Sequence, residues 1–415
     1  MIALDQREWA LPGEMCRPEV QQRVLELADS MLEARIVDGV EGDAVQPELE
    51  LARRLVASRQ AVLANARAFK IGVVFAMWRE GARIRPPALD NPRGENCIEV
   101  KAQALDWLFR DTPITWEIFA VDDGCDQGSG DAARAMAANS AWQKRIHVLD
   151  LCDNPFSTRK PLSHLRSPSD SIKGGAIMLG CLAAAEAGCD YVVYTDCDNS
   201  VSVGQIGLLL HPVLTRQLKV VMGDRALPGT LQWRSPQRYS NDKYVVLKHM
   251  RAMLSEAIGL TDFTSPFKCF ATDVLLRIIE DIRVFNFAFD YDVVLSALAK
   301  GYKPASVEYS FYDSFEESTW HHHGVARVWF DQFQGLVAAL RRHRIPHNAE
   351  LANFIAEHIR HPDDVAALVD TPPPAPLRFA PSALLGKQTT YSAAELVAWG
   401  GHRRDRVEAR QELAG

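Results

Sequence analysis

Short apolar strands alternate with helices between residues 69 and 194, and this alternation limits the fold more than any other feature of the sequence. Four segments rich in β-branched and aromatic residues are predicted as buried strands. They are residues 71–76, 117–121, 146–149 and 191–194. A helical segment is predicted between each strand and the next. Strands connected through helices form a mostly parallel sheet with helices on both faces, so we predict an α/β fold.

Charged and aromatic side chains follow three of these strands at the point where each strand ends. They are Trp78 and Arg79 after the first strand, Asp122 and Asp123 after the second, and Asp196 and Asp198 after the fourth. Because ligands of open α/β sheets bind outside the carboxyl ends of the strands, these residues are expected at one edge of the sheet. Three such strand ends favour a site over three unrelated turns.

Asp196 and Asp198 indicate the chemistry of this edge. Carboxylates at positions i and i+2 can point to the same side of an extended or turning chain. A hard divalent cation can then hold both carboxylates and two phosphate oxygens. The alternative is a turn, since Asp198, Asn199 and Ser200 are ordinary turn residues. The motif alone leaves both interpretations open.

The composition argues against several classes of protein. The 415 residues carry a formal net charge of -7, so no broad basic surface for nucleic acid is expected. The 8 cysteines include no CxxC pair and no zinc-type spacing, which suits reduced cysteines in the cytoplasm. The N-terminus lacks the basic start and apolar run of a signal peptide. No stretch approaches the ~20 apolar residues of a membrane span, so we expect a cytoplasmic protein, either soluble or in peripheral contact with a membrane.

A helical region precedes the alternating segment, which we place at residues 69–323. Residues 1–68 contain two amphipathic patterns, over 20–35 and 49–68, that predict two helices. This N-terminal extension would form either a cap on the catalytic body or a contact in a homo-oligomer.

A second helical region follows, over residues 324–415. It begins with a predicted helix over 325–342, whose apolar stripe suits a core or a lipid-facing surface. A stiff Pro-rich linker is predicted over 371–381. A charged helix is predicted over 392–413.

Six blocks of sequence arrive in the order and spacing found in family 2 glycosyltransferases of the GT-A fold. They are VDDGCDQGSGD, IKGGAIMLG, YVVYTDCDNS, MGDR, DFTSPFKCF and FAFDYDVVLSALAKGYK. Between residues 71 and 318 the chain most resembles the branch that makes polyprenyl-phosphate sugars, such as the dolichyl-phosphate glucose and mannose synthases. The resemblance implies an inverting transferase that uses a UDP- or GDP-sugar and Mg2+ or Mn2+. The acceptor would be a polyprenyl phosphate or a soluble small molecule.

The resemblance also implies roles for single residues. Asp122 and Asp123 would contact the nucleoside, and Asp196 and Asp198 would hold the metal ion on the diphosphate. Arg225, in the block MGDR, would lie near the same diphosphate. Breaking a glycosyl-phosphate bond adds negative charge to the leaving diphosphate, and a metal ion neutralises that charge.

Two lysines are further candidates. Lys173 and Gly174 stand at the start of a helix, where backbone N–H groups and an ammonium can meet the negative charge of a nucleotide. A solvated lysine beside a helix start explains the same pattern. The resemblance implies that Lys173 contacts the base or the phosphates of the nucleotide. The block DFTSPFKCF resembles the acceptor-side segment of the polyprenyl-phosphate branch, which would place Lys268 near a phosphate.

The chain departs from the family after the first strand. The family usually has a proline, an aromatic residue and Asn-Glu there, and this chain has Ala76-Met77-Trp78-Arg79-Glu80. We still expect Ala76, Trp78 and Arg79 at the nucleotide site. The loops over residues 84–96 and 153–170 are also longer than is usual in the family, so the outer wall of the nucleotide pocket, which contacts the sugar, is expected to differ.

Asp290 and Asp292 are the candidates for a general base. An acceptor hydroxyl must lose its proton to a positioned base, whereas an acceptor phosphate is already an anion and needs none. The alternative role is structural, because Asp290 can cap the helix that follows and Asp292 suits its first turn.

His321 and His323 belong to a run of three histidines that follows Trp320. Many GT-A enzymes add a downstream histidine to the metal, and this run stands at a similar point in the chain. A solvated loop is the alternative interpretation.

Two other functions stay open at this stage. A nucleotidyltransferase on a related sheet would also use two carboxylates and a metal, but it usually has a glycine-rich loop with an arginine and a lysine after its first strand. Residues 70–86 contain no such loop. A non-catalytic nucleotide-sugar-binding protein would use Asp196 and Asp198 only to shape a turn.

Overall fold

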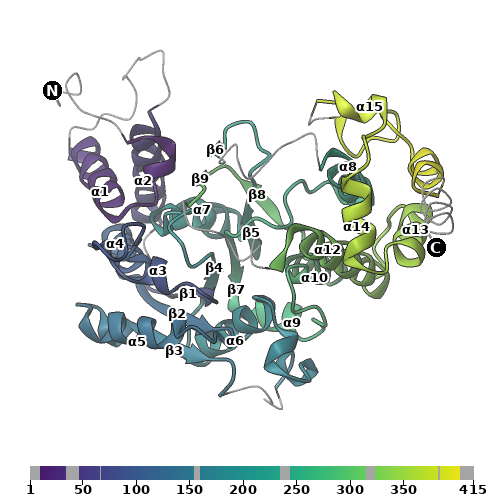
Figure 1. The fold of residues 1–415 in the computed structure, drawn as a ribbon. Coiled ribbons are helices and arrows are strands. Elements are labelled where there is room, and N and C mark those ends of the chain that lie inside the picture. Colours follow the sequence, from purple (N-terminus) through teal and green to yellow (C-terminus); the bar gives the residue numbers. More distant parts are fainter. Residues whose placement is uncertain are drawn as a thin grey trace.

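The computed structural model describes residues 10–33, 46–65, 67–153, 159–233, 244–314, 323–381 and 384–401. Among these residues the strands form a central seven-stranded sheet in the order β3-β2-β1-β4-β7-β5-β8 (Figure 1). Its strands are β1 (Lys70–Met77), β2 (Thr115–Asp122), β3 (Ile146–Asp150), β4 (Tyr191–Tyr194), β5 (Val220–Gly223), β7 (Lys268–Ala271) and β8 (Ala305–Val307). A small second sheet pairs β6 (Leu231–Trp233) with β9 (Ser310–Tyr312).

The strands of the central sheet are parallel except at β7. Strand β1 pairs in parallel with β2 and β4, β2 with β3, and β5 with β8. Strand β7 runs antiparallel to both of its neighbours, β4 and β5. The predicted α/β class is confirmed, because the sheet is mostly parallel and is flanked by helices. Each of the four predicted strands lies within one of β1 to β4.

Helices cover both faces of the sheet, as the continuous apolar character of its strands requires. They are α3 (Gly81–Ile84), α4 (Cys97–Phe109), α5 (Ser129–Asn139), α6 (Gly174–Glu186), α7 (Ile206–Arg216), α9 (Thr272–Ile279) and α10 (Phe289–Ala299). Side chains alternate along β1, so Ile71 and Val73 enter one core while Val74 enters the other, against α6. A Cβ atom at Gly72 would lie 2.7 Å from a side chain of α6, so glycine lets this helix lie close to the sheet.

The N-terminal helices are part of the main hydrophobic core. Helices α1 (Pro18–Glu33) and α2 (Pro47–Ala64) lie beside α4 and α7 at one end of the molecule (Figure 1). The Ser58 hydroxyl of α2 donates to the Gly204 carbonyl at 2.6 Å and accepts from the Gly207 N–H at 2.9 Å. Both predicted helices are present, and they share one core with β1 and α4.

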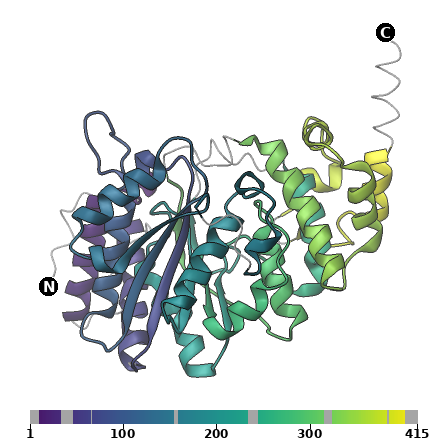
Figure 2. The ribbon, with the colours of Figure 1, turned by 90° about the horizontal axis from the view of Figure 1, so that it is seen from below.

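The C-terminal helices pack at the opposite end of the molecule (Figure 2). They are α12 (Val325–Arg342), α13 (Ala349–His358), α14 (Pro362–Val369) and α15 (Ala375–Arg378). The apolar stripe of α12, with Phe333, Leu336 and Leu340 fully buried, belongs to the same core as α8 (Val245–Ser255) and α10. The stripe is therefore core and not a lipid-facing surface.

The Pro-rich stretch 371–381 differs from the predicted linker. It contains the short helix α15, whose Leu377 is fully buried in the core that α8 and α12 share. Burial of this apolar side chain attaches the stretch to the body of the protein. The charged helix predicted over 392–413 is present at residues 393–401, and the rest of it lies outside the described residues. No described helix is both long and apolar enough to cross a bilayer.

Candidate active site

A cavity of about 590 Å3 opens at the carboxyl edge of the parallel strands. Residues that follow β1, β2, β4 and β5 line it, so these strand ends meet at one place. The sequence-predicted residues on its wall are Ala76, Trp78, Asp123, Lys173, Asp196, Asp198, Arg225, Asp290 and His323. Those outside the wall are Arg79, Asp122, Gly174, Lys268 and Asp292. His321 lies outside the described residues.

Asp196 forms an ion pair with Lys173 on the cavity wall. The Lys173 ammonium donates to Asp196 Oδ1. Lys173 immediately precedes α6 with a positive φ of 77°, and its backbone N–H donates to Asp123 Oδ2 at 2.5 Å. Burial alone would lower the pKa of Lys173, but the carboxylates of Asp196 and Asp290 outweigh it and raise that pKa. Lys173 is therefore a charged member of the site and not a solvated lysine beside a helix start.

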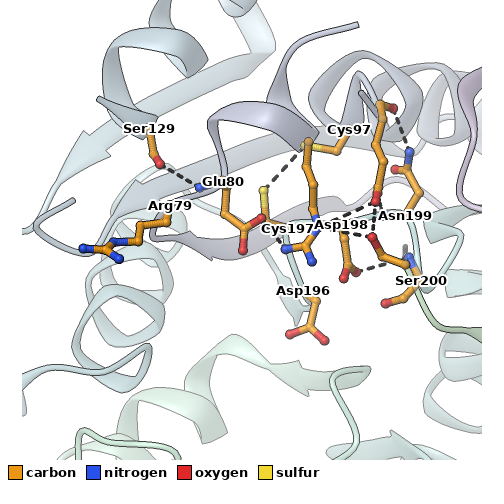
Figure 3. Close-up of polar contacts among 12 residues, drawn as sticks. Arg79, Glu80, Cys97, Ser129, Asp196, Cys197, Asp198, Asn199 and Ser200 are labelled. Atoms are coloured by element: carbon orange, nitrogen blue, oxygen red, sulfur yellow. Dashed lines mark hydrogen bonds and ion pairs between the residues drawn. The ribbon is translucent and has the colours of Figure 1, made fainter. Parts of the chain in front are cut away.

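Asp198 is surrounded by donors and cations. Its Oδ1 accepts from the Ser200 N–H at 3.2 Å (Figure 3). Its backbone carbonyl accepts from Lys101 Nζ at 2.5 Å. Burial alone would raise the pKa of Asp198, but the charges of Arg83 and Lys101 and the hydrogen bonds from Ser200 lower it overall. Asp198 is therefore ionised at neutral pH, which is the state that a metal ligand needs.

The two acids after β2 have different environments. Asp123 lines the cavity and accepts from the Ser171 hydroxyl at 2.6 Å. Burial raises the pKa of Asp123 to about 7, and its hydrogen bonds partly oppose this. Asp122 instead accepts from the backbone N–H groups of Cys125 and Gly130, each at 2.6 Å. Asp122 therefore holds the loop before α5 together, and the structure does not bring it to the cavity.

Arg225 follows β5 and is held by Asp262. Its guanidinium donates to both Asp262 oxygens at 2.7 Å, and its backbone N–H donates to Oδ2 at 3.0 Å. The guanidinium also lies 5.4 Å from the centre of the Phe311 ring. Burial alone would raise the pKa of Asp262, but Arg225 lowers it strongly, so both partners stay charged. Arg225 thus presents positive charge in a fixed orientation to the cavity.

Asp290 reaches the cavity from the first turn of α10. Its Oδ1 accepts from Lys268 Nζ at 2.6 Å and from the Tyr194 hydroxyl at 2.8 Å. Lys268, on β7, is fully buried, and its ammonium also donates to the Ser265 carbonyl. The sequence predicted Lys268 beside an acceptor phosphate. The structure places it as a buried support for the Asp290 carboxylate.

Asp292 lies on the other side of the same helix, because residues two apart are about 200° apart around a helix axis. It is fully buried, accepts from the Arg283 N–H at 2.9 Å, and lies 2.7 Å from His343 Nε2. Of the two candidate bases, the structure brings Asp290 alone to the cavity. The N-cap position of α10 belongs to Ala288, so the predicted capping role of Asp290 is not observed.

Aromatic rings form another part of the wall. The His323 ring stacks on Trp78 with centroids 4.8 Å apart and meets Phe287 edge-on at 5.7 Å. The Arg79 guanidinium lies 4.5 Å from the centre of the Trp78 ring and points away from Asp196 in Figure 3. Arg79 thus supports the wall without reaching the cavity, and its positive φ of 57° turns the chain at this point.

Several residues on the wall were not singled out from the sequence. They include Glu80, Arg83, Gln232, Tyr244, Lys248, Arg251 and Trp329. Lys248 and Arg251 are three residues apart on α8, so they share one face of that helix. The Arg251 guanidinium lies 4.9 Å from the centre of the Trp329 ring and donates to Gln332 at 3.3 Å. The spacing of Lys248 and Arg251 indicates a basic face on this helix. Whether that face of α8 lines the cavity depends on how α8 packs near α12.

The carboxylate pair suits a hard divalent cation. Asp196 and Asp198 both line the cavity, and their carboxylates point to the same side in Figure 3. Proteins usually hold Mg2+ with one or two carboxylates, the remaining ligands being water and substrate phosphates. Among the described residues, no three His, Cys, Asp or Glu side chains form a metal-binding group.

Comparisons with known proteins found similar structures. No family model and no curated protein matches the sequence. Glucosyl-3-phosphoglycerate synthase from Mycobacterium tuberculosis with phosphoglyceric acid is 14% identical, with a TM-score of 0.44 over 71% of this chain and 85% of that chain. The same enzyme with Mn2+, UDP and glucosyl-3-phosphoglycerate is 14% identical, with a TM-score of 0.44 over 75% and 88%. Mannosyl-3-phosphoglycerate synthase from Rubrobacter xylanophilus is 14% identical, with a TM-score of 0.43 over 73% and 80%.

Proposed function

We propose that the protein is a metal-dependent glycosyltransferase that moves a sugar from a UDP- or GDP-sugar to an acceptor, with inversion at the anomeric carbon. One observation carries the proposal. The carboxylates of Asp196 and Asp198 and the cations of Lys173 and Arg225 line one cavity at the carboxyl edge of the sheet. A nucleoside diphosphate has the matching chemistry, because its oxygens bind divalent cations, ammonium groups and guanidinium groups.

The charged residues would act when the glycosyl-phosphate bond breaks. Bound Mg2+ or Mn2+, held by Asp196 and Asp198, would neutralise charge on the leaving diphosphate. Lys173 and Arg225 would bind the diphosphate oxygens and stabilise the same developing charge. Asp262 already fixes the Arg225 guanidinium, so little of its orientational freedom is lost when the nucleotide binds.

Asp290 is the proposed general base for an acceptor hydroxyl. A base must lie within hydrogen-bond reach of the proton that it takes, and Asp290 is on the cavity wall. Lys268 and Tyr194 bind its Oδ1 and so set the orientation of the carboxylate. An acceptor phosphate needs no base, so Asp290→Asn would retain activity in that case and lose it with a hydroxyl acceptor.

The wall between α8 and α12 supports an acceptor with negative charge. Lys248 and Arg251 both line the cavity there. Within the described part of the chain, the contacts observed for the Arg251 guanidinium are with the neutral groups of Gln332, Trp329 and Tyr291. A phosphate or carboxylate would compensate this positive charge. We therefore propose as acceptor either a polyprenyl phosphate, which requires contact with a membrane surface, or a soluble anionic molecule.

The proposal is tested by incubating the protein with Mn2+ and a panel of UDP-, GDP- and dTDP-sugars, with and without cell extract as a source of acceptor. We expect one sugar nucleotide to release nucleoside diphosphate in an acceptor-dependent reaction. Asp198→Asn should abolish the release with the fold intact, and a fully active variant would contradict the role assigned to Asp198. Pyrophosphate release from a nucleoside triphosphate would identify a nucleotidyltransferase instead. Binding without turnover would identify a binding protein.

A further inference from the structure

The loop that carries Asp196 and Asp198 is tied to segments far away in the sequence. Asn199 directly follows Asp198 and is only 2% exposed. Its side-chain amide donates to the Cys16 carbonyl at 3.1 Å and to the Glu95 carbonyl at 2.8 Å. Its backbone N–H donates to Glu95 Oε2 at 2.8 Å. One asparagine thus joins the loop to the N-terminal extension and to the segment before α4.

Cys16 lies in the turn just before α1, and this turn reaches the loop by a second route. The Cys16 thiol donates to the Tyr312 carbonyl at 3.5 Å, and the Tyr312 N–H donates to the Ser200 carbonyl at 3.0 Å. The turn itself is held by Gln21 of α1, whose side chain donates to the Met15 carbonyl at 2.6 Å. The N-terminal extension therefore contacts the loop directly and also through β9.

Glu95 connects Asn199 to the charged groups around Asp198. Its Oε1 accepts from the Ser314 hydroxyl and lies 3.6 Å from Arg83 Nε. Arg83 also pairs with Glu80 at 2.5 Å, and all three charged side chains are buried. Separating any of these buried pairs would leave a charge uncompensated, which is costly. The network therefore has few alternative arrangements. In Figure 3, Glu80 lies on one side of Asp198, and Asn199 and Ser200 lie on the other.

We propose that Asn199 is a positioning residue for the metal site, through which the N-terminal extension acts on the reaction. Cys16, Glu95 and Asn199 form a clamp that holds the loop, so that the carboxylates of Asp196 and Asp198 stay together before a cation binds. The restraint is needed because two like charges held close together repel each other. This inference rests on the proposed metal-dependent function.

An asparagine suits the clamp better than other residues. Its amide nitrogen has two N–H donors, which match the carbonyls of Cys16 and Glu95. A serine hydroxyl has one donor and can serve one of these carbonyls, and alanine can serve neither. The series Asn, Ser, Ala at position 199 therefore weakens the clamp in two steps while adding no charge near Asp198.

The test measures Mn2+ binding by electron paramagnetic resonance, in the presence of UDP, for the wild type, Asn199→Ser and Asn199→Ala. Loss of a group that orients metal ligands typically costs roughly 10- to 100-fold in metal affinity, which we expect for Asn199→Ala. Asn199→Ser should lie between it and the wild type. Thermal unfolding of each variant shows that it is folded, and binding of UDP without metal should be unchanged.

Gln205 supplies a matched control. It is fully buried, and its side-chain amide donates to the Ser310 carbonyl at 3.1 Å and accepts from the Ser310 N–H at 2.8 Å. Gln205→Ala therefore removes a similar buried amide at β9 and not at Asn199, so it shows whether loosening the indirect route through β9 is enough to affect the metal site. It should lower thermal stability and leave the Mn2+ affinity unchanged.

The outcomes separate the clamp from the proposed function. A folded Asn199→Ala variant with wild-type Mn2+ affinity would overturn the clamp and leave the proposed function standing. An equal loss of Mn2+ affinity in Gln205→Ala would also overturn the clamp, because loss of any buried amide nearby would then lower the affinity as much as loss of Asn199. Should Asn199→Ala fail to fold, the affinity of Asn199→Ser decides in the same way. A wild type that binds no Mn2+ even with UDP would overturn the proposed function and the clamp together.

Discussion

Replacement of Lys268 by methionine should destabilise the fold strongly. The Lys268 ammonium is fully buried, donates to Asp290 Oδ1 at 2.6 Å and to the Ser265 carbonyl, and lies 5.1 Å from the centre of the Tyr194 ring. Methionine fills a similar volume but leaves the Asp290 carboxylate, which is 5% exposed, without its cation. Removing one partner of a buried ion pair typically costs about 3–5 kcal/mol, and we expect a loss of that size in the free energy of unfolding.

A double-mutant cycle separates the charge left behind from the change in packing. Asp290→Asn removes that charge, so the variant with both substitutions should recover much of the loss seen in Lys268→Met. The matched control is Lys300, which pairs with Asp281 at 2.5 Å with side-chain exposures of 29% and 48%. Lys300→Met should cost at most about 1 kcal/mol, because exposed ion pairs contribute little.

The assay is urea unfolding of the four variants and the wild type, followed by tryptophan fluorescence. A loss in Lys268→Met no larger than that in Lys300→Met would refute this account of the buried pair. It would also reopen the prediction that Lys268 binds an acceptor phosphate.

Three further results are expected. The pKa of the Asp123 carboxyl is raised from the ordinary 3.8 to about 7, so the folded state binds the carboxyl proton more tightly than the unfolded state does. The stability that this proton adds is complete below about pH 4 and is lost as the pH rises to about 7. Asp123→Asn should flatten the pH dependence of urea unfolding in that window, and an unchanged profile would contradict the assignment. Leu377→Ala should lower the free energy of unfolding by about 2–5 kcal/mol, whereas no change would restore the interpretation of 371–381 as a linker. Arg225→Lys loses the two-point contact with Asp262 and should weaken UDP binding in calorimetry; an unchanged affinity would exclude Arg225 from the diphosphate site.

The edge of the sheet at which the site lies could be predicted from the sequence. Strand β4 is apolar and ends directly before Asp196 and Asp198, and the helical segments around it require parallel neighbours. Acids after such a strand lie at the carboxyl edge whatever the rest of the chain does. The apolar pattern of the strand and the rule that ligands bind at the carboxyl edge of a parallel sheet are enough to predict where Asp196 and Asp198 lie.

Choosing between neighbouring acids required the structure. Asp122 ends β2 and turns to the N–H groups of its own loop, whereas Asp123 turns to the cavity. Asp290 and Asp292 lie on different sides of α10, so helical periodicity predicts that one of them faces the site. Which of the two faces the site depends on how α10 packs against the sheet and α12. The local sequence does not predict that packing.

The cations were the hardest residues to interpret. The resemblance of the block DFTSPFKCF to an acceptor-side segment implies a phosphate beside Lys268, but Asp290 compensates the charge of Lys268 from 22 residues away. Arg251 meets Gln332 from 81 residues away, where α8 and α12 share one core. Neither pairing has a local signal, because each depends on where two distant helices or strands meet.

The most direct measurement of the central claim is a crystal structure of the protein with Mn2+ and UDP, in which the anomalous scattering of manganese locates the metal. The account predicts one manganese peak coordinated by both Asp196 and Asp198, with the diphosphate in contact with Lys173 and Arg225. Manganese or UDP bound away from this edge of the sheet, or no binding at saturating concentrations, would contradict it.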